Sequence, residues 1–230
     1  MKITIKRFDK RKEPQSIDMN YPIFEGLTLL ENFIKIKTTL DPTLSFNGVC
    51  RSGVCGSCSV MVNGKAVLAC SYKPKDGDHI EPLNYHEVKR DLIVDKSGVQ
   101  STLITAKTWL QSDAKKENAN KVEVQSSCIL CDSCFASCPV MAVNENFLGP
   151  FTLTKAYRYS IQGDNRETID LIQQNGVWDC TLCGECTLAC PQGIDPKMDI
   201  MNLRSRSVQA GYCDPNFANM SFGLDFTQGF

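Results

Sequence analysis

The spacing of the cysteines constrains this chain more than any other feature of its sequence. Residues 128–139 read CILCDSCFASCP and residues 180–191 read CTLCGECTLACP. Both have the spacing CxxCxxCxxxCP, in which three closely spaced thiolates bind three corners of an iron-sulfur cube and the fourth cysteine serves a second cube. Two complete copies, each closed by Cys-Pro, predict an internal repeat that folds around two such cubes.

Crossed ligand sets follow from this spacing, because the fourth cysteine of each copy points away from its own loop. For the first [4Fe-4S] cluster we predict the ligands Cys128, Cys131, Cys134 and Cys190. For the second we predict Cys180, Cys183, Cys186 and Cys138, which would become a [3Fe-4S] site if Cys183 did not bind.

Other uses of cysteine fit the pattern less well. Zinc sites pair two CxxC units across a longer gap instead of placing four cysteines within eleven residues. A disulfide framework is disfavoured because the chain has 13 cysteines, an odd number, and because no secretory leader is recognisable at its start.

A different cysteine pattern precedes the repeat. It reads NGVCRSGVCGSC and contributes Cys50, Cys55 and Cys58, followed by Cys70. Cx4CxxC with a distant fourth cysteine is the plant-type arrangement for a [2Fe-2S] cluster. The glycines of this loop allow positive φ and let backbone N–H groups approach the inorganic sulfides.

The surrounding segments predict a small sheet with one helix. Residues 2–8 and 16–21 alternate polar and apolar side chains, as strands do. Thr28 and Glu31 form a capping-box pattern that predicts a helix from residue 28 onward. Asn63-Gly64 predicts a hairpin between strands at 59–62 and 65–69, which brings Cys70 back towards the cysteine loop.

Helical periodicity dominates the later part of the chain. Ser101 is predicted to cap a helix whose apolar face carries Leu103, Ile104, Ala106 and Leu110. Residues 114–127 are lysine-rich and are predicted to form a solvated connection. Two further helices are predicted at 151–161 and at 166–173, the latter capped by Asn165.

Together these patterns predict an α+β chain of two domains. Residues 1–98 are expected to form a β-grasp, plant-type ferredoxin domain with the [2Fe-2S] site. Residues 99–230 are expected to form an all-α, bacterial-ferredoxin-like domain with the two cubane-type clusters. Because its cysteines occupy positions where a core should be, this second part is expected to unfold without metal.

Composition excludes several classes of function. A net charge of −1, with both signs interspersed, gives no nucleic-acid footprint. No apolar run approaches the roughly 20 residues of a membrane span, so membrane contact is expected only through partners. His79 and His86 are expected at the surface, away from the cluster loops, and no nucleotide-binding or nucleophile motif is present. Three clusters without a substrate site predict one-electron transport between partners.

The whole chain resembles the iron-sulfur subunits of succinate dehydrogenases and fumarate reductases. The resemblance rests on DPTLSFNGVCRSGVCGSCSVMVNG, on RDLIVD at 90–95, on GP and AYR within 149–158, and on CPQGIDP at 190–196. It implies a partner flavoprotein with covalently bound FAD that interconverts succinate and fumarate. The flavin would lie nearest the Cys50 cluster, and electrons would continue to the Cys128 cluster and then to the Cys180 cluster.

Two departures from the commonest members of this family are informative. Those members lack a cysteine at the position of Cys183 and hold a [3Fe-4S] centre, whereas this sequence predicts [4Fe-4S] there. Many quinone-linked relatives carry tryptophans after Cys138-Pro139, but here residues 140–144 read VMAVN. The resemblance therefore implies a cysteine-rich, heterodisulfide-reductase-like subunit on the membrane side instead of a haem-bearing cytochrome b, with quinone or a thiol/disulfide pair handled there.

Location and alternatives complete the prediction. The subunit is expected to be peripheral on the inner membrane, on the cytoplasmic side by default, or on the periplasmic side if exported with its flavoprotein. The alternatives are an iron-sulfur subunit of another flavin-dependent dehydrogenase and a stand-alone multi-cluster ferredoxin. Cys213 is interpreted as a buried or incidental thiol, and Phe222, Phe226 and Phe230 as part of a docking tail.

Overall fold

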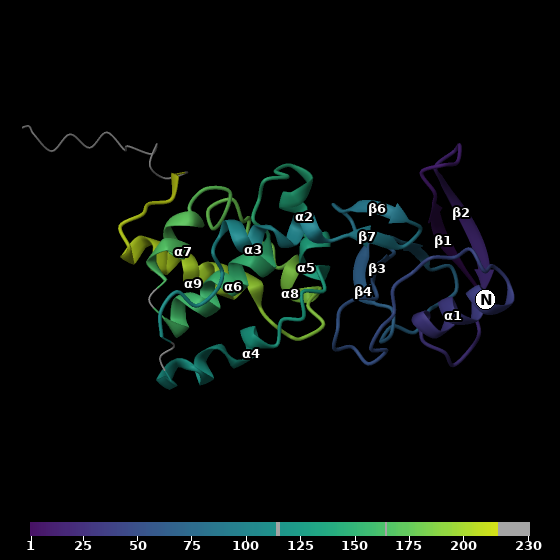
Figure 1. Ribbon diagram of the computed structural model, residues 1–230, viewed down its shortest axis with the longest axis horizontal. Coiled ribbons are helices and arrows are strands. Elements are labelled where there is room, and N and C mark those ends of the chain that lie inside the picture. The colour runs from purple at the N-terminus through teal and green to yellow at the C-terminus, as the bar shows by residue number, and fades with distance from the viewer. Residues whose placement is uncertain (114–115, 164, 216–230) are drawn as a thin grey trace, which may run out of the picture.

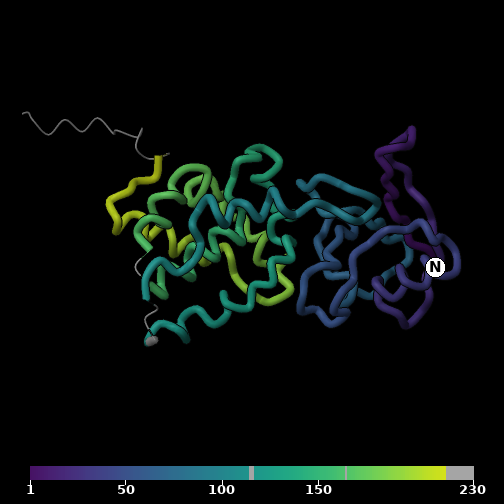
Figure 2. Tube along the Cα trace, in the orientation of Figure 1, coloured from purple at the N-terminus to yellow at the C-terminus, as the bar shows by residue number. Residues whose placement is uncertain are grey.

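A computed structural model describes residues 1–113, 116–163 and 165–215. The strands occupy the N-terminal part and the longer helices the C-terminal part, and the two parts lie side by side along the long axis of the molecule (Figure 1; Figure 2). The predicted docking tail lies outside the described residues. The mixed strand and helix content agrees with the predicted α+β class.

A five-stranded sheet with the order β2-β1-β5-β3-β4 forms the N-terminal part. Its strands are β1 (Lys2–Phe8), β2 (Ser16–Pro22), β3 (Ser59–Val62), β4 (Lys65–Leu68) and β5 (His79–Glu81). β1 pairs antiparallel with β2 and parallel with β5, so the first strand lies inside the sheet. Asn63 and Gly64 both have positive φ, as the predicted β3–β4 hairpin requires.

Helix α1 (Leu29–Thr39) covers the sheet and begins as predicted. The Thr28 side chain accepts from the Glu31 backbone N–H, and the Glu31 side chain accepts from the Thr28 N–H, which completes the capping box. Its buried face meets the inward face of the sheet in one apolar core, which includes Ile3, Ile5, Leu29, Leu30, Phe33, Ile36 and Ile80.

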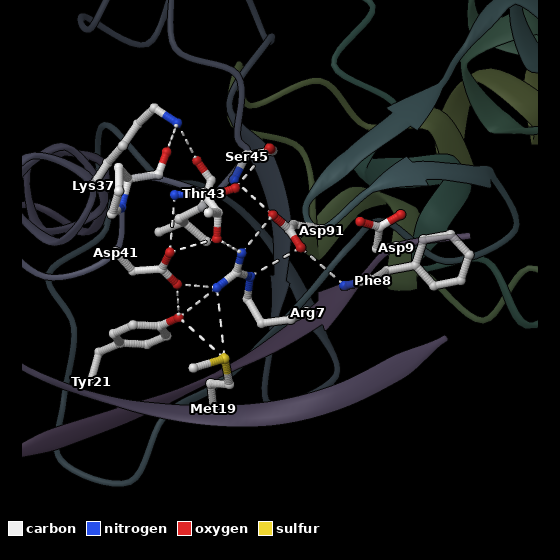
Figure 3. Close-up of polar contacts among 12 residues, drawn as sticks. Arg7, Phe8, Asp9, Met19, Tyr21, Lys37, Asp41, Thr43, Ser45 and Asp91 are labelled. Atoms are coloured by element: carbon white, nitrogen blue, oxygen red, sulfur yellow. Dashed lines mark hydrogen bonds and ion pairs between the residues drawn. The ribbon is translucent and has the colours of Figure 1, made fainter. Parts of the chain in front are cut away.

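A buried polar network ties the two ends of this part together (Figure 3). Arg7 on β1 forms ion pairs with Asp41, at the end of α1, and with Asp91. Asp91 also accepts from the backbone N–H groups of Phe8, at 3.0 Å, and of Ser45, at 2.8 Å. The segment that leads from α1 into the cysteine loop is therefore fixed to β1.

The helical part is built on α6 (Pro150–Gln162) and α9 (Pro196–Gln209), which pack against each other. Around them lie α2 (Ser97–Gln100), α3 (Thr102–Thr105), η1 (Lys116–Asn118), η2 (Asn120–Val122), α4 (Glu123–Ser126), α5 (Ser133–Ala136), η3 (Pro139–Ala142), α7 (Arg166–Leu171) and α8 (Glu185–Leu188). Phe147, Phe151, Leu153 and Leu203 share the core with buried cysteines. The helix predicted at 151–161 is confirmed.

Two local predictions for this part, at Ser101 and at Asn165, are wrong. Two short helices, α2 and α3, replace the single helix predicted after Ser101. The Ser101 side chain makes no capping hydrogen bond, and Ile104, predicted on the apolar face, is exposed. The connection predicted at 114–127 is mostly solvated in its described residues 117–127, as expected, although it forms short helices and buries Val122. Asn165 occupies the capping position of α7, but its side-chain amide donates to the Trp109 carbonyl instead of capping the helix.

Sequence reasoning also missed several elements, among them three short strands and one long helix. The short strand β5 was hidden in a polar stretch, and β6 (Glu87–Arg90) and β7 (Ile93–Asp95) form a separate antiparallel pair. Helix α9 begins at Asp195, whose side chain accepts from the Met198 N–H, followed by Pro196 at the first helical position. An N-cap aspartate before proline is a recognisable start signal that would have found this helix.

Candidate iron-sulfur centres

The loop between α1 and β3 brings the first four cysteines together. Cys50, Cys55 and Cys58 lie on this loop, and Cys70 lies just beyond β4, where the hairpin returns it. The Ser52 backbone N–H, 3.4 Å from Cys50 Sγ, is the main cause that lowers the pKa of Cys50 to about 6, with a further contribution from the Cys55 thiol. The Cys70 and Cys55 thiols also lie beside Cys58.

The two cubane motifs have matching backbone conformations. Leu130 and Leu182 have positive φ, and so do Asp132 and Gly184 two residues later. A short helix follows each pair, α5 in the first motif and α8 in the second, and the two helices contact each other. The repeat seen in the sequence is therefore a repeat of structure.

The first predicted cubane set surrounds one cavity. Cys128, Cys131, Cys134 and Cys190 all line one small cavity, together with Phe151 and Thr154 of α6. Cys190 comes from the second motif, so the crossing of the two motifs expected from the spacing is present in this geometry. Thiols that line a cavity suit a multi-atom cluster, and the donor set is the one that iron-sulfur cubes use.

The second predicted set gathers around Cys186. The Cys180, Cys138 and Cys183 thiols all lie close enough to affect the pKa of Cys186, which burial raises to about 12. Cys138 arrives from the end of the first motif, and Cys183 is the exposed member of the set. Arg204 fixes this loop by donating to the Cys180 carbonyl at 2.6 Å.

Burial shapes the chemistry of most of these thiols. It raises the pKa of Cys58 to about 11, and it raises the pKa values of Cys131, Cys138 and Cys180. Burial also raises the pKa of Cys134 well above the ordinary thiol value, assisted by neighbouring thiols from both motifs. A buried thiolate needs a cationic partner. Metal binding would therefore release the protons of these thiols and, at the same time, stabilise the fold.

No described group of three His, Cys, Asp or Glu side chains converges closely enough to hold a single metal ion. Cys213 is exposed, which contradicts the buried interpretation and leaves the incidental one.

One histidine prediction is wrong. His79 lies on β5 with its side chain 34% exposed, but the side chain of His86 is 0% exposed. His86 Nε2 lies 3.3 Å from a carboxylate oxygen of Asp132, the residue after Cys131, and its ring meets the edge of Phe135. His86 therefore packs against a cluster loop, which its position in a polar stretch of sequence did not indicate.

Comparison with known proteins agrees with both cysteine patterns. A family model described as "2Fe-2S iron-sulfur cluster binding domain" matches residues 2–101, and one described as "4Fe-4S dicluster domain" matches residues 124–194. The 8-methylmenaquinol:fumarate reductase iron-sulfur subunit of Wolinella succinogenes is 35% identical over 92% of this chain and 74% of its own. This chain belongs to the family of fumarate reductase and succinate dehydrogenase iron-sulfur subunits.

Other members extend the comparison. The mitochondrial succinate dehydrogenase [ubiquinone] iron-sulfur subunit of Dictyostelium discoideum is 36% identical over 78% of this chain and 71% of its own. A chain of the Mycobacterium smegmatis Sdh1 complex in the apo form has a TM-score of 0.78 at 23% identity, covering 92% of this chain and 97% of that chain, which shows a shared fold.

Family membership confirms the prediction of an electron-transfer subunit of an oxidoreductase complex. It also places both [2Fe-2S] and [4Fe-4S] binding domains in this iron-sulfur subunit. Within the described residues, every helix is too short or too polar to cross a lipid bilayer.

Proposed function

We propose that this subunit relays electrons between the FAD of a flavoprotein, which interconverts succinate and fumarate, and a partner on the membrane side. The observation that carries the proposal is the gathering of twelve cysteines into three separate groups, one of which lines a single cavity. A chain that holds three redox centres is suited to passing single electrons from one partner to another.

The proposed ligands follow the three groups. Cys50, Cys55, Cys58 and Cys70 would hold [2Fe-2S], and Cys128, Cys131, Cys134 and Cys190 would hold the first [4Fe-4S]. Cys180, Cys183, Cys186 and Cys138 would hold the second [4Fe-4S]. In the proposed division, residues 1–98 form the β-grasp domain and residues 99–230 the all-α domain. The clusters supply the one-electron chemistry, and the chain supplies thiolates, spacing and exclusion of water.

Apolar side chains around the third group support a protein partner there. Val143, directly after η3, is 86% exposed, and Leu188 on α8 is 82% exposed. η3 and α8 carry or adjoin Cys138 and Cys186, so both apolar side chains lie on the elements that hold this group. A protein partner seated on these two elements would cover both apolar side chains. Together with Cys183 and the lack of tryptophan at residues 140–144, this exposure supports a cysteine-rich membrane-side subunit.

The decisive experiment is purification of the complex without oxygen. We expect about ten irons per chain, matching sulfide and negligible zinc. The complex should contain a covalent FAD subunit and should reduce fumarate with an artificial electron donor. Far fewer irons, or a chain that elutes alone without a flavoprotein, would contradict the proposal. Co-purification with a dihaem membrane anchor would contradict the proposed membrane-side partner alone.

A further inference from the structure

The loops of two different cysteine groups touch at Gly56. This glycine lies between Cys55 and Cys58 and has a φ of +67°. A Cβ atom added to it would lie 2.7 Å from Cβ and 2.8 Å from Cα of Cys131. Because real Cβ atoms do not approach that closely, the backbone of the [2Fe-2S] loop contacts a cubane cysteine only where a side chain is missing.

Lys96 bridges the same two loops. Its Nζ donates to the Cys131 carbonyl at 2.9 Å and to the Gly56 carbonyl at 3.4 Å, and it lies 3.6 Å from Asp132 Oδ2. The side chain is 21% exposed, so this ammonium is largely shielded from water. Lys96 follows β7 directly, at the point where the strand-rich part passes into the helical part.

A second hydrogen-bonded bridge supports the same contact. The Gln192 side-chain amide donates to the Gly53 carbonyl at 3.2 Å, and Gln192 lines the cavity of the first cubane group. Cys131 itself packs within the apolar core of the strand-rich part. Two bridges and one shared core therefore hold the two cysteine groups in a fixed relation.

We propose that the contact of Gly56, Lys96 and Cys131 is the junction through which an electron passes between the [2Fe-2S] centre and the first cubane, and that Lys96 is the positioning residue that keeps it closed. This proposal rests on the proposed function. With both clusters bound, one electron would leave the reduced [2Fe-2S] centre, oxidising it, and would enter the cubane, reducing it. No bond is made or broken and no proton moves.

The physical basis is distance and charge. Electron tunnelling slows steeply as the gap between centres widens, and direct backbone contact without an intervening side chain keeps that gap small. The Lys96 ammonium, beside Cys131, also stabilises the negative charge that the cubane gains, more strongly than it could in bulk water. A neutral residue at position 96 would lose both effects.

The first test uses Gly56→Ala in the assembled complex, with Gly77→Ala as control. Gly77 has a similar φ of +80°, but nothing lies within 4 Å of its added Cβ. Relaxation of the reduced [2Fe-2S] signal in electron paramagnetic resonance should quicken when the first cubane is also reduced and paramagnetic. We expect this enhancement to fall by half or more in Gly56→Ala and to persist in Gly77→Ala. Unchanged enhancement in Gly56→Ala would overturn the junction.

The second test removes the bridge. Lys96→Met should weaken the enhancement and lower the midpoint potential of the first cubane, whereas Lys96→Arg should restore both. Lys89→Met is the control, because Lys89 pairs with Asp95 on the neighbouring hairpin and is largely exposed. If the Gly56→Ala complex assembles without its [2Fe-2S] signal, the proposal is tested by Lys96→Met alone. Wild-type relaxation and a wild-type midpoint potential in Lys96→Met would overturn the proposal.

These outcomes are separable from failure of the proposed function. Loss of the junction leaves all three centres present, each with its own spectroscopic signal. If the wild-type complex itself contained no [2Fe-2S] or cubane signal, the proposed function would fail before any variant was compared.

Discussion

The identity of a single residue, Cys183, decides the type of the third proposed centre. We predict that Cys183→Ser converts this centre from [4Fe-4S] to [3Fe-4S], because a hydroxyl is a poorer ligand for the fourth iron. On mild oxidation the anaerobic variant should give an intense [3Fe-4S] resonance that the wild type lacks. Cys213→Ser, at the other exposed cysteine, is the control and should change nothing. A stoichiometric [3Fe-4S] signal in the wild type would refute the assignment.

Asp199 on α9 is a buried carboxyl whose ionisation affects stability. It is 2% exposed, and burial raises its pKa to about 6, against the opposing effects of Gln125 and Thr154. The unfolded chain loses this proton near pH 4 and the folded chain near pH 6. The contribution of the Asp199 carboxyl to the free energy of unfolding is therefore fully present below about pH 4 and is lost as the pH rises to about 6.

We therefore predict that Asp199→Asn stabilises the protein above pH 6 by about 1–3 kcal/mol, since the asparagine oxygen still accepts from Gln125 without carrying a charge. Anaerobic melting temperatures at pH 5 and pH 8 would measure this. The gain should be larger at pH 8, and Glu145→Gln, at an exposed carboxyl, should show no such difference. An equal gain at both pH values would contradict the buried-charge explanation.

At the scale of elements, the Arg7 network fixes β1, the end of α1 and the segment before the first cysteine loop to one another (Figure 3). The Asp91 side chain is only 3% exposed, so removing Arg7 leaves a buried carboxylate without its cation. We predict that Arg7→Met costs about 3 kcal/mol and speeds loss of the [2Fe-2S] absorption on heating. Lys10→Met, which breaks an exposed pair with Glu87, should cost less than about 1 kcal/mol. Equal costs would show that burial of Asp91 is unimportant.

Elements with strong local signals could be predicted from sequence, and those made by tertiary pairing could not. The capping box at Thr28 and the Asn63-Gly64 turn each act within a few residues, so α1 and the β3–β4 hairpin were found. Strand β5 has three residues and owes its conformation to pairing with β1 and β3. The helix predicted from Ser101 failed because its backbone turns at Ala106 and Lys107, which no apolar spacing reveals.

At the scale of the whole molecule, cysteines that we propose as cluster ligands also take part in packing. Cys134, Cys138 and Cys186 lie inside the core of the helical part, beside Phe135 and Phe151. We predict that iron removal under reducing conditions exposes the amides of α5 and α8 to solvent, while the β1–β2 pair keeps its protection. Hydrogen exchange before and after chelation, with iron and sulfide restored as control, would measure this. Equal protection in the helical part with and without iron would contradict it.

The cysteine groups, unlike their surroundings, could be predicted before the fold was known, because ligand spacing is a property of short segments. The contacts of His86, Lys96 and Gln192 could not, since each side chain reaches the cysteine loop of the other part only when the two parts of the chain dock. Their signals lie in contacts between residues as far apart in sequence as Gly53 and Gln192. Sequence spacing thus predicts the centres, and docking determines what joins them.

Cys131 has a consequence for how such a subunit is made. This cysteine of the first cubane group is packed into the apolar core of the strand-rich part. Only 8% of this residue is exposed in the folded chain. If the proposed cube is bound there, we expect its loading to precede or accompany docking of the two parts, so that protein made without iron should be cut by proteases faster than the loaded subunit.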